Sequence, residues 1–386
     1  MKNKITEIIW WESCITEHQI HTLSELSKLP NIKLSVFAER NEDLIRKEQG
    51  WKECDWTLID IHLIPIFKYR FIFKTLKDKK NCIHIFGGPF DSSIISFALF
   101  LSTLMSIKSY VLTEPYIPIA ANLHYDKGGL RNWFLNKIRP LKYRILWTLL
   151  KSRVQGVFAI SHMAIQQLLR FGINSDKIFP YAYFVPSSKS HSKNDASFQT
   201  SSDDLLRIIF VGTLNHRKGI DIAINVVNKI NFLNKKVILD IYGPSNKTYD
   251  YAWSSHVRYK GLVPFGDVES TISKYDFLIL PSRFDGWGVV INEALLARVP
   301  VICSNQAGAS SLVKKWDCGV CYDSTNESEL EKLIEDICLN KEIMLNNFIV
   351  NLQKTLEVIT PKIGAEFILS SIETEKNENK KNNWYV

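Results

Sequence analysis

The sequence lacks an apolar run long enough to cross a bilayer. The longest largely apolar stretch, Ser92–Ile107, has 16 residues, whereas a spanning helix needs roughly 20. We therefore expect a buried helix at this position. An export signal is also missing, because the apolar run after Met1–Lys4 is only Ile8–Trp11, which is shorter than the apolar region of a signal peptide. Both absences favour a cytoplasmic protein.

Two signatures of cofactor and metal binding are missing as well. No Gly-x-Gly-x-x-Gly turn follows a first strand, which argues against a nicotinamide-dependent oxidoreductase. No Asp-x-Asp pair is present to hold a metal ion on a diphosphate, so we expect neither a catalytic metal nor a cofactor. Seven cysteines are scattered through the chain, and Cys318 and Cys321 have CxxC spacing without a second such pair. In a cytoplasmic protein they are expected to be free thiols.

Positive charge is concentrated in the first half of the chain. Residues 1–200 contain 27 Lys and Arg against 17 Asp and Glu, and the whole chain carries a formal net charge of +8. The densest region, residues 127–153, has no acidic residue and interleaves Trp133, Phe134, Tyr143 and Trp147 with its cations, which are Lys127, Arg131, Lys137, Arg139, Lys142, Arg144, Lys151 and Arg153. This mixture suits a peripheral contact with anionic membrane headgroups, and equally a solvated helical face over core aromatics. No motif that reads nucleic acid accompanies the charge, so nucleic acid is not an expected partner.

A polar, serine-rich stretch divides the chain. A chain of 386 residues exceeds what one core usually organises, so two domains are expected. Residues 187–205 lack apolar periodicity and are predicted to link residues 1–186 to residues 206–360. On both sides, short apolar strands alternate with helical patterns, which indicates an α/β fold with two doubly wound Rossmann-like domains. Such sheets bind ligands at the carboxyl ends of their strands, so the site is expected in a cleft between the domains.

The expected strands are short and apolar. In the first domain they are Ile5–Trp10, Lys33–Ala38, Asn81–Phe86, Ser109–Leu112 and Gly156–Ile160. In the second domain they are Arg207–Val211, Lys236–Tyr242, Asp276–Leu280 and Val299–Cys303, with helices at Ile220–Ile230, Gly288–Ala297 and Glu327–Leu339.

The first candidate site motif is Val211–Gly219, where a strand runs into a loop and a helix starts near Asp221. The loop carries Arg217 and Lys218 side by side. Two cations beside a helix N-terminus suit a diphosphate. By itself the motif leaves open an ordinary surface Arg-Lys pair.

The second motif is Pro281–Ala294, where a strand ends, a glycine-containing loop turns and a helix begins near Gly288. Asp285 and Glu293 would flank a phosphate at the helix start with carboxylates that suit sugar hydroxyls. The N–H groups that would face the phosphate are those of Gly288, Val289 and Val290. Taken alone, the pattern also fits an ordinary helix start with two acids.

Together the two motifs resemble the retaining GT-B glycosyltransferases of family four. That family combines a Gly–(Arg)–Lys-Gly loop with the signature S-x-x-E-G-x-G-x-x-x-x-E-A, and this sequence reads Ser282-Arg-Phe-Asp-Gly-Trp-Gly-Val-Val-Ile-Asn-Glu-Ala294. The segments Leu239–Gly243, Val257–Leu262 and Lys274–Ser282 are similar to further landmarks of the family in order and spacing. The resemblance covers roughly residues 205–340.

The resemblance implies a role for each matched position. Arg217 and Lys218 would hold the donor diphosphate and offset the charge of the leaving group. Glu293 would bind the ribose hydroxyls, and Asp285 would touch the transferred sugar. The other donor-side positions are Gly212, Thr213, Gly243, Gly261, Leu262, Gly286, Gly288, Val289 and Val290. The chain departs from the family at two of these positions, because Asp285 replaces the usual Glu and Thr213 replaces an Arg often found after the loop glycine.

The first half resembles the family less closely. Thr16-Glu-His-Gln19 is similar to a Pro-His-Gln variant of some bacterial polysaccharide transferases, which would place His18 at the mouth of the cleft. Asn81–Gly88 resembles the family's acceptor-side histidine segment and makes His84 and Gly87 candidates. A buried histidine with satisfied ring nitrogens is the alternative for His84. Glu114 and His124, in the next strand-to-loop region, complete the expected acceptor side.

The end of the chain also resembles the family. Thr360–Ile372 is similar to the terminal helix that crosses back onto the N-terminal domain, so residues 361–386 are expected to form that helix and a frayed tail.

The resemblance implies a retaining glycosyltransferase of the cytoplasm or of the inner face of the cytoplasmic membrane. Its partners would be a nucleotide sugar and a glycan or lipid-linked acceptor, in bacterial cell-surface polysaccharide or lipopolysaccharide biosynthesis. Front-face attack and a covalent intermediate both remain open. The alternative from another class is a non-catalytic subunit of the same fold that binds a nucleotide or glycan, which the Asp285 and Thr213 departures allow.

Overall fold

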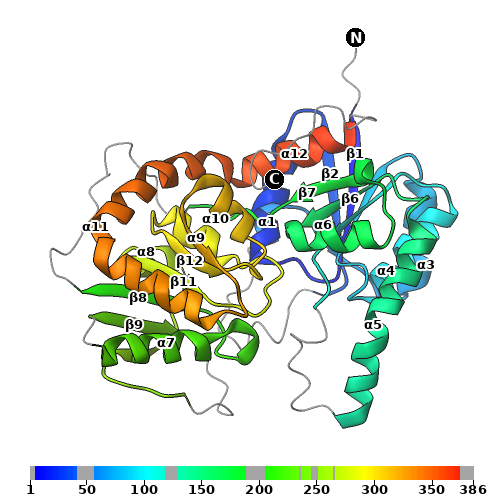
Figure 1. Ribbon diagram of the computed structural model, residues 1–386. Coiled ribbons are helices and arrows are strands. Elements are labelled where there is room, and N and C mark those ends of the chain that lie inside the picture. The colour runs from blue at the N-terminus through cyan, green and yellow to red at the C-terminus, as the bar shows by residue number, and fades with distance from the viewer. Residues whose placement is uncertain are drawn as a thin grey trace.

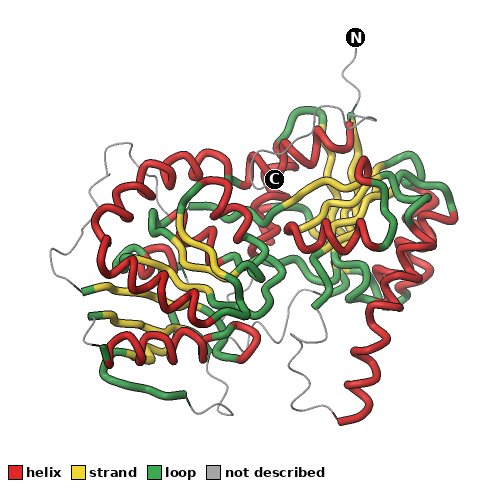
Figure 2. Tube along the Cα trace, in the orientation of Figure 1, coloured by secondary structure: helices red, strands yellow, loops and turns green. Residues whose placement is uncertain are grey.

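The computed structural model contains two parallel β-sheets, each wrapped by helices (Figures 1 and 2). It describes residues 5–40, 56–117, 129–187, 205–233, 236–244, 251–263 and 266–373, and the side chains of residues 56 and 129–137 are outside that description. The α/β class with two Rossmann-like domains, expected from the alternation of strands and helices, is confirmed.

The N-terminal sheet has seven strands in the order β3-β2-β1-β4-β5-β6-β7. They are β1 (Thr6–Glu12), β2 (Ile32–Ala38), β3 (Ile61–Leu63), β4 (Ile83–Gly87), β5 (Ser109–Thr113), β6 (Gly156–Ile160) and β7 (Ile178–Tyr181). The order reverses between β1 and β4, which pair in parallel from Ile8 opposite Ile83. This reversal is the switch point at which doubly wound sheets bind ligands.

The C-terminal sheet has six strands in the order β10-β9-β8-β11-β12-β13. They are β8 (Leu206–Val211), β9 (Val237–Tyr242), β10 (Val257–Gly261), β11 (Phe277–Leu280), β12 (Val301–Ser304) and β13 (Gly319–Tyr322). Here the order reverses between β8 and β11, and the two candidate site motifs follow these two strands. The sheet therefore brings the motifs together at its own switch point.

The helices bury apolar faces on both sides of the N-terminal sheet. On one side, the apolar cluster joins the strands to α3 (Lys68–Asp78), α4 (Ser93–Leu104) and α5 (Gly129–Leu150). On the other side, a second apolar cluster joins the strands to α1 (Glu17–Lys28) and α12 (Pro361–Glu373). The remaining α-helices of the described residues are α6 (Ser161–Arg170), α7 (Ile220–Phe232), α8 (Val268–Ile272), α9 (Val290–Leu296), α10 (Ser310–Trp316) and α11 (Glu327–Val358).

Helix α12 connects the end of the chain to the N-terminal domain (Figure 1). Its Phe367 ring lies 6.3 Å from the ring centroids of both Phe158 and Tyr181. The Lys108 ammonium donates to the Ile372 carbonyl at 3.1 Å. The two domains are thus joined by packing as well as by the connecting chain.

The structure differs from the sequence expectations at element ends and edges. Helix α9 begins at Val290, two residues later than expected, because Gly288 has a φ of +91° that a right-handed helix cannot contain. Helix α11 runs past the expected end at Leu339 to Val358, with a kink at Asn340. The edge strands β3, β7, β10 and β13 were not anticipated as strands.

Candidate active site

The core of the candidate site is an ion pair between the two motif loops. The Lys218 ammonium lies 2.5 Å from an Asp285 carboxylate oxygen, and Arg217 lies 3.9 Å from the other oxygen. Both members of the closer pair are largely buried, with side-chain exposures of 14% and 12%. The sequence places these residues 67 positions apart, and the parallel pairing of β8 with β11 brings them together.

The loop after β8 is built to present its two cations. The Asn215 side chain accepts a hydrogen bond from the Lys218 N–H at 3.0 Å and caps a short 3₁₀ turn, His216–Lys218. Gly219 follows with a φ of +66°, and a Cβ there would lie 1.9 Å from the Pro281 carbonyl oxygen. Only glycine permits this close approach of the two loops.

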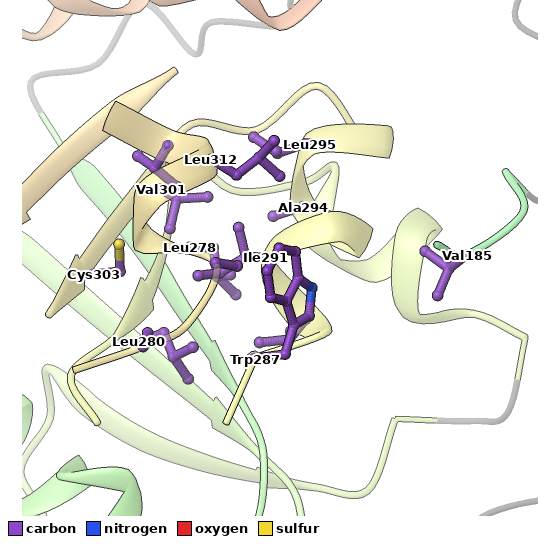
Figure 3. Close-up of a cluster of buried hydrophobic side chains, with 14 of the residues drawn as sticks. Val185, Leu278, Leu280, Trp287, Ile291, Ala294, Leu295, Val301, Cys303 and Leu312 are labelled. Carbon is purple, nitrogen blue, oxygen red and sulfur yellow. The ribbon is translucent and has the colours of Figure 1, made fainter. Parts of the chain in front are cut away.

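The loop after β11 is held by backbone hydrogen bonds to the segment 306–308. The Asp285 N–H donates to the Gln306 carbonyl at 2.9 Å, and the Gly308 N–H donates to the Asp285 carbonyl at 3.0 Å. Next to it, the buried Trp287 indole donates to Asn292 at 2.7 Å. Figure 3 shows the Trp287 ring among apolar side chains, beside Ile291. Asp285 is therefore held on a rigid support.

A second ion pair fastens the two loops below the site. The Arg283 guanidinium makes two hydrogen bonds of 2.7 Å to the Asp221 carboxylate and one of 2.8 Å to the His216 carbonyl. The Arg217 guanidinium donates to the Phe284 carbonyl at 3.0 Å. Bidentate Arg–carboxylate pairs fix geometry as well as charge, so the spacing of Lys218 and Asp285 is preorganised.

Burial and neighbouring charges shift the pKa values of the charged groups of the site. Burial lowers the pKa of Lys218, against the effect of the Asp285 charge. Burial alone would raise the pKa of Asp285, but the charges of Lys218 and Arg217 outweigh it and hold that pKa below its ordinary value. Asp285 is thus ionised at neutral pH.

Glu293, on the first turn of α9, has a different environment. Burial and the nearby Glu269 carboxylate raise the pKa of Glu293 to about 7, although Lys218 acts in the opposite direction. Its carboxylate accepts no hydrogen bond from the residues that the structure describes. Glu293 is partly buried, and withdrawing a carboxylate from water without a hydrogen-bond donor is costly, so a ligand with hydroxyl groups would supply the missing donors.

Glycines after β8 and β9 and at the end of β10 lie together near Lys218, since a Cβ on Gly212 would lie 3.9 Å from the Lys218 Cε atom. A Cβ on Gly243 would lie 1.9 Å from the Gly212 carbonyl oxygen, and the Gly243 N–H donates to the Gly261 carbonyl at 2.8 Å. Leu262, next along the chain, is half-exposed, and Thr213 is partly exposed. The expected donor-side residues, including Gly288, Val289 and Val290 near the start of α9, therefore follow the carboxyl ends of the strands of the C-terminal sheet.

Glu114 reaches this edge from the N-terminal domain. It follows β5, its side chain accepts a hydrogen bond from the Tyr183 hydroxyl, and its charge acts on the pKa of Lys218. A Cβ added to Gly286 would lie 2.5 Å from a Glu114 carboxylate oxygen. The sequence placed Glu114 on the acceptor side, and the structure also brings it into contact with the donor-side loop.

His18 lies at the start of α1, nearly buried, with its ring 5.8 Å from the Tyr183 ring. Since the Tyr183 carbonyl accepts a hydrogen bond from the Asn292 amide of α9 at 3.0 Å, His18 lies near the boundary between the domains. His124 lies outside the described residues.

His84 does not face an acceptor. It is fully buried, its Nδ1 accepts a hydrogen bond from the Trp11 indole at 3.0 Å, and its Nε2 donates to the Lys79 carbonyl at 3.0 Å. Burial lowers the pKa of His84 to about 4, so the ring is neutral. The expected acceptor-side role of His84 is corrected to a packing role, because both ring nitrogens are already bonded inside the sheet.

Gly87 marks a group that the sequence did not reveal. A Cβ on Gly87 would lie 1.7 Å from the carboxyl group of Glu12, at the end of β1. Glu12 is buried and accepts hydrogen bonds from the Gln19 amide at 3.0 Å and the Trp10 indole at 3.4 Å. Burial raises the pKa of Glu12 to about 8, so it is mostly protonated at pH 7. Its position directly after an apolar strand is a signal that sequence reasoning could have used.

A pocket of about 450 Å³ opens beside this group, at the carboxyl ends of β4 and β5. Its lining includes the two acids Asp91 and Glu114 and the two cations Arg139 and Lys142 of α5. Burial raises the pKa of Asp91, against the lowering effect of these two cations. Aromatic walls come from Phe90, Tyr116 and Tyr143. Aromatic faces with charged groups at the edges suit a sugar that carries an anionic substituent.

Comparison with known proteins finds similarity to glycosyltransferases. Residues 192–355 match the family described as "Glycosyl transferases group 1". The putative teichuronic acid biosynthesis glycosyltransferase TuaC of Bacillus subtilis is 34% identical over 209 residues, which are 53% of this chain and 49% of TuaC. The O-antigen biosynthesis glycosyltransferase WbnH of Escherichia coli is 21% identical over 81% of this chain and 86% of its own. The chain spans 39% to 49% of the length of the relatives that it matches at 30% identity or more.

Solved structures show the same arrangement of domains. HepE of Anabaena, crystallised in complex with UDP, superposes with a TM-score of 0.68 over 95% of this chain and 100% of HepE, at 13% identity. The two Rossmann-like domains therefore form a GT-B fold. Together with the family match, the comparisons support a glycosyltransferase with this fold.

Proposed function

We propose that this chain is a retaining glycosyltransferase that binds a nucleoside-diphosphate sugar on the C-terminal sheet and transfers the sugar to an acceptor held by the N-terminal domain. The observation that carries the proposal is the group formed by Lys218, Asp285 and Glu293. The loops after β8 and β11 and the first turn of α9 present a largely buried cation, a buried carboxylate and a carboxylate with no hydrogen-bond partner among the described residues, all at one switch point. The group lies within the segment that matches the glycosyltransferase family.

The proposed roles follow from charge and position. Lys218 and Arg217 would bind the donor diphosphate and stabilise the negative charge that develops as the nucleotide departs. Such preorganised charge is often the largest contribution to catalysis. The same two cations make the proposed transfer independent of a divalent metal. Asp285, one methylene shorter than the family's usual Glu, would bind the transferred sugar, and Glu293 would accept hydrogen bonds from the ribose.

The substrates are proposed from the relatives and the pocket. HepE binds UDP in its crystal structure, which makes UDP the first nucleotide to test. TuaC is named as a putative teichuronic acid biosynthesis glycosyltransferase, and WbnH as an O-antigen biosynthesis glycosyltransferase. We therefore propose a glycan or lipid-linked acceptor of bacterial polysaccharide or lipopolysaccharide assembly, bound in the pocket between Asp91 and Arg139. The protein would act in the cytoplasm.

The test is thermal stabilisation by UDP, GDP, ADP and CMP, alone and as sugar conjugates. A ligand that binds the native state raises Tm with concentration and affinity. We expect one nucleoside diphosphate to stabilise the wild type and to lose this effect in Glu293→Ala. Glu342→Ala, an exposed acid on α11, is the matched control and should respond like the wild type. No shift with any nucleotide would refute the proposed donor site.

Turnover distinguishes the enzyme from a non-catalytic binding subunit. With the stabilising nucleotide sugar and extracted lipid-linked glycans, the wild type should release nucleoside diphosphate and form a product with the anomeric configuration of the donor, in EDTA as in magnesium. Binding without release, across all acceptors, would favour the non-catalytic subunit. An inverted product would refute retention.

A further inference from the structure

One helical layer of the N-terminal domain carries an unusual share of the exposed apolar surface. Of the 22 large apolar side chains exposed in the described residues, ten lie on α3, α4, α5 or directly before α3. We call these ten the apolar face; they are Ile66, Phe67, Tyr69, Phe73, Phe100, Leu104, Ile138, Leu141, Ile145 and Leu149. Large exposed apolar patches mark interaction sites on soluble proteins.

Helix α5 contributes a regular stripe to the apolar face. Leu141, Ile145 and Leu149 follow one another at four-residue spacing, and they are 57%, 53% and 50% exposed. Residues four apart lie on the same side of a helix. The opposite side of α5 carries the fully buried Trp147, whose ring contacts Phe90 at 5.2 Å. Helix α5 thus carries apolar residues on both its inner and its outer side.

Helices α3 and α4 continue the same layer. The Tyr69 and Phe97 rings meet edge to face at 4.9 Å and join α3 to α4. Phe67, just before α3, is 79% exposed. Together α3, α4 and α5 cover one side of the N-terminal sheet (Figure 1), and their outer surfaces have no covering element among the described residues.

The charges on this layer are almost all positive. Helix α4 has no charged residue, and residues 138–150 of α5 have no acidic residue. Asp78 is the one acid of α3. The cations of these segments are Lys68, Arg70, Lys74, Lys77, Arg139, Lys142 and Arg144. Of these, Lys68 is paired with Glu39. A surface that mixes exposed aromatic and aliphatic side chains with cations is complementary to anionic lipid headgroups above an acyl layer.

We propose that the apolar face docks the protein on an anionic lipid bilayer. The apolar side chains enter the headgroup region, while Arg70, Lys74 and Arg144 contact lipid phosphates. Helix α5 also lines the pocket at the ends of β4 and β5 through Arg139 and Lys142. Docking through α5 therefore brings that pocket close to the headgroups. The inference goes beyond the proposed transferase activity and does not depend on it.

The experiment is co-sedimentation of the full chain with vesicles of phosphatidylcholine alone or mixed with phosphatidylglycerol. We expect the wild type to bind the mixed vesicles, to bind more weakly in high salt, and to leave the neutral vesicles largely unbound. Each cation near an anionic surface contributes a factor of about five to partitioning. Arg144→Gln should lower binding by about that factor, and Ile145→Ser/Leu149→Ser should lower it at least as much.

A matched control comes from α11, which exposes Leu339 and Ile343 by 68% and 64%. Leu339→Ser/Ile343→Ser should bind vesicles like the wild type. Circular dichroism and Tm verify that each variant is folded, and a nucleotide-induced Tm shift that is unchanged in the α5 variants separates docking from the donor site. The proposal fails if wild type binds neutral and anionic vesicles equally, or if the α11 variant loses as much binding. It also fails if the apolar face instead joins two copies, seen as a dimer without lipid that Ile145→Ser/Leu149→Ser dissociates.

Discussion

Lys218 has two proposed roles: it neutralises Asp285 in the empty site, and it binds the donor diphosphate. Replacing Lys218 removes both. In Lys218→Met the Asp285 carboxylate stays buried with only Arg217 nearby, at 3.9 Å. Breaking a buried pair by removing one partner costs about 3–5 kcal/mol. Because Arg217 compensates in part, we predict a loss near the lower end, about 3 kcal/mol of unfolding free energy. Turnover should fall on the order of a hundredfold, as when one donor to a developing anion is removed.

The double substitution Lys218→Met/Asp285→Asn tells the two roles apart. It removes the uncompensated charge, so stability measured by urea unfolding and tryptophan fluorescence should return to within about 1 kcal/mol of the wild type. Turnover should stay low, because the cation for the diphosphate is still absent. Lys354→Met, an exposed lysine on α11, is the control for a lost surface charge. If the double variant regained wild-type turnover, Lys218 would act only by holding Asp285, and the diphosphate role would be refuted.

Three further predictions follow from other contacts. The pKa of Glu293 is raised to about 7, so the carboxyl group is protonated in the free protein below that pH. Nucleotide affinity measured by calorimetry should therefore rise as the pH increases through about 7. Glu293→Gln should bind the nucleotide weakly and should not show this rise. His84→Phe leaves the Trp11 indole and the Lys79 carbonyl without their hydrogen bonds, which should cost about 1–3 kcal/mol of unfolding free energy. The kcat/KM of the folded variant should be unchanged. A large loss of kcat/KM in a stable variant would contradict the packing role of His84. Gly286→Ala would place a methyl group against the Glu114 carboxylate and should lower the unfolding free energy by about 1–3 kcal/mol. In a double-mutant cycle, adding Glu114→Ala should remove most of that loss. Additive losses would mean that the two residues are not in contact in solution.

The C-terminal half was the easier part to predict from sequence. Its strands are short and apolar, and its loops contain glycine. The loop with Arg217 and Lys218 follows β8 and the loop with Asp285 follows β11, two strands that a doubly wound sheet places side by side. That topology is enough to predict that Lys218 and Asp285 approach each other. The sequence did not indicate that they form a direct ion pair, because side-chain contacts depend on how Gly219 and Pro281 fit together.

The N-terminal half was harder because its chemistry depends on tertiary contacts. The sequence around His84 allowed either an acceptor-side residue or a buried core residue, and the hydrogen bond from Trp11, 73 positions away, makes it a core residue. Glu12 was overlooked because a single acid after a strand is common, and its contact with Gly87 exists only once β1 and β4 are paired. The strand β3 has three residues, too few to show a period.

The most direct test of the donor site is a crystal structure of the protein with the nucleoside diphosphate that stabilises it. The account predicts the diphosphate within hydrogen-bond distance of the Lys218 ammonium and the ribose hydroxyls on the Glu293 carboxylate. A nucleotide bound instead at the N-terminal switch point, between Glu12 and Gly88, would contradict it.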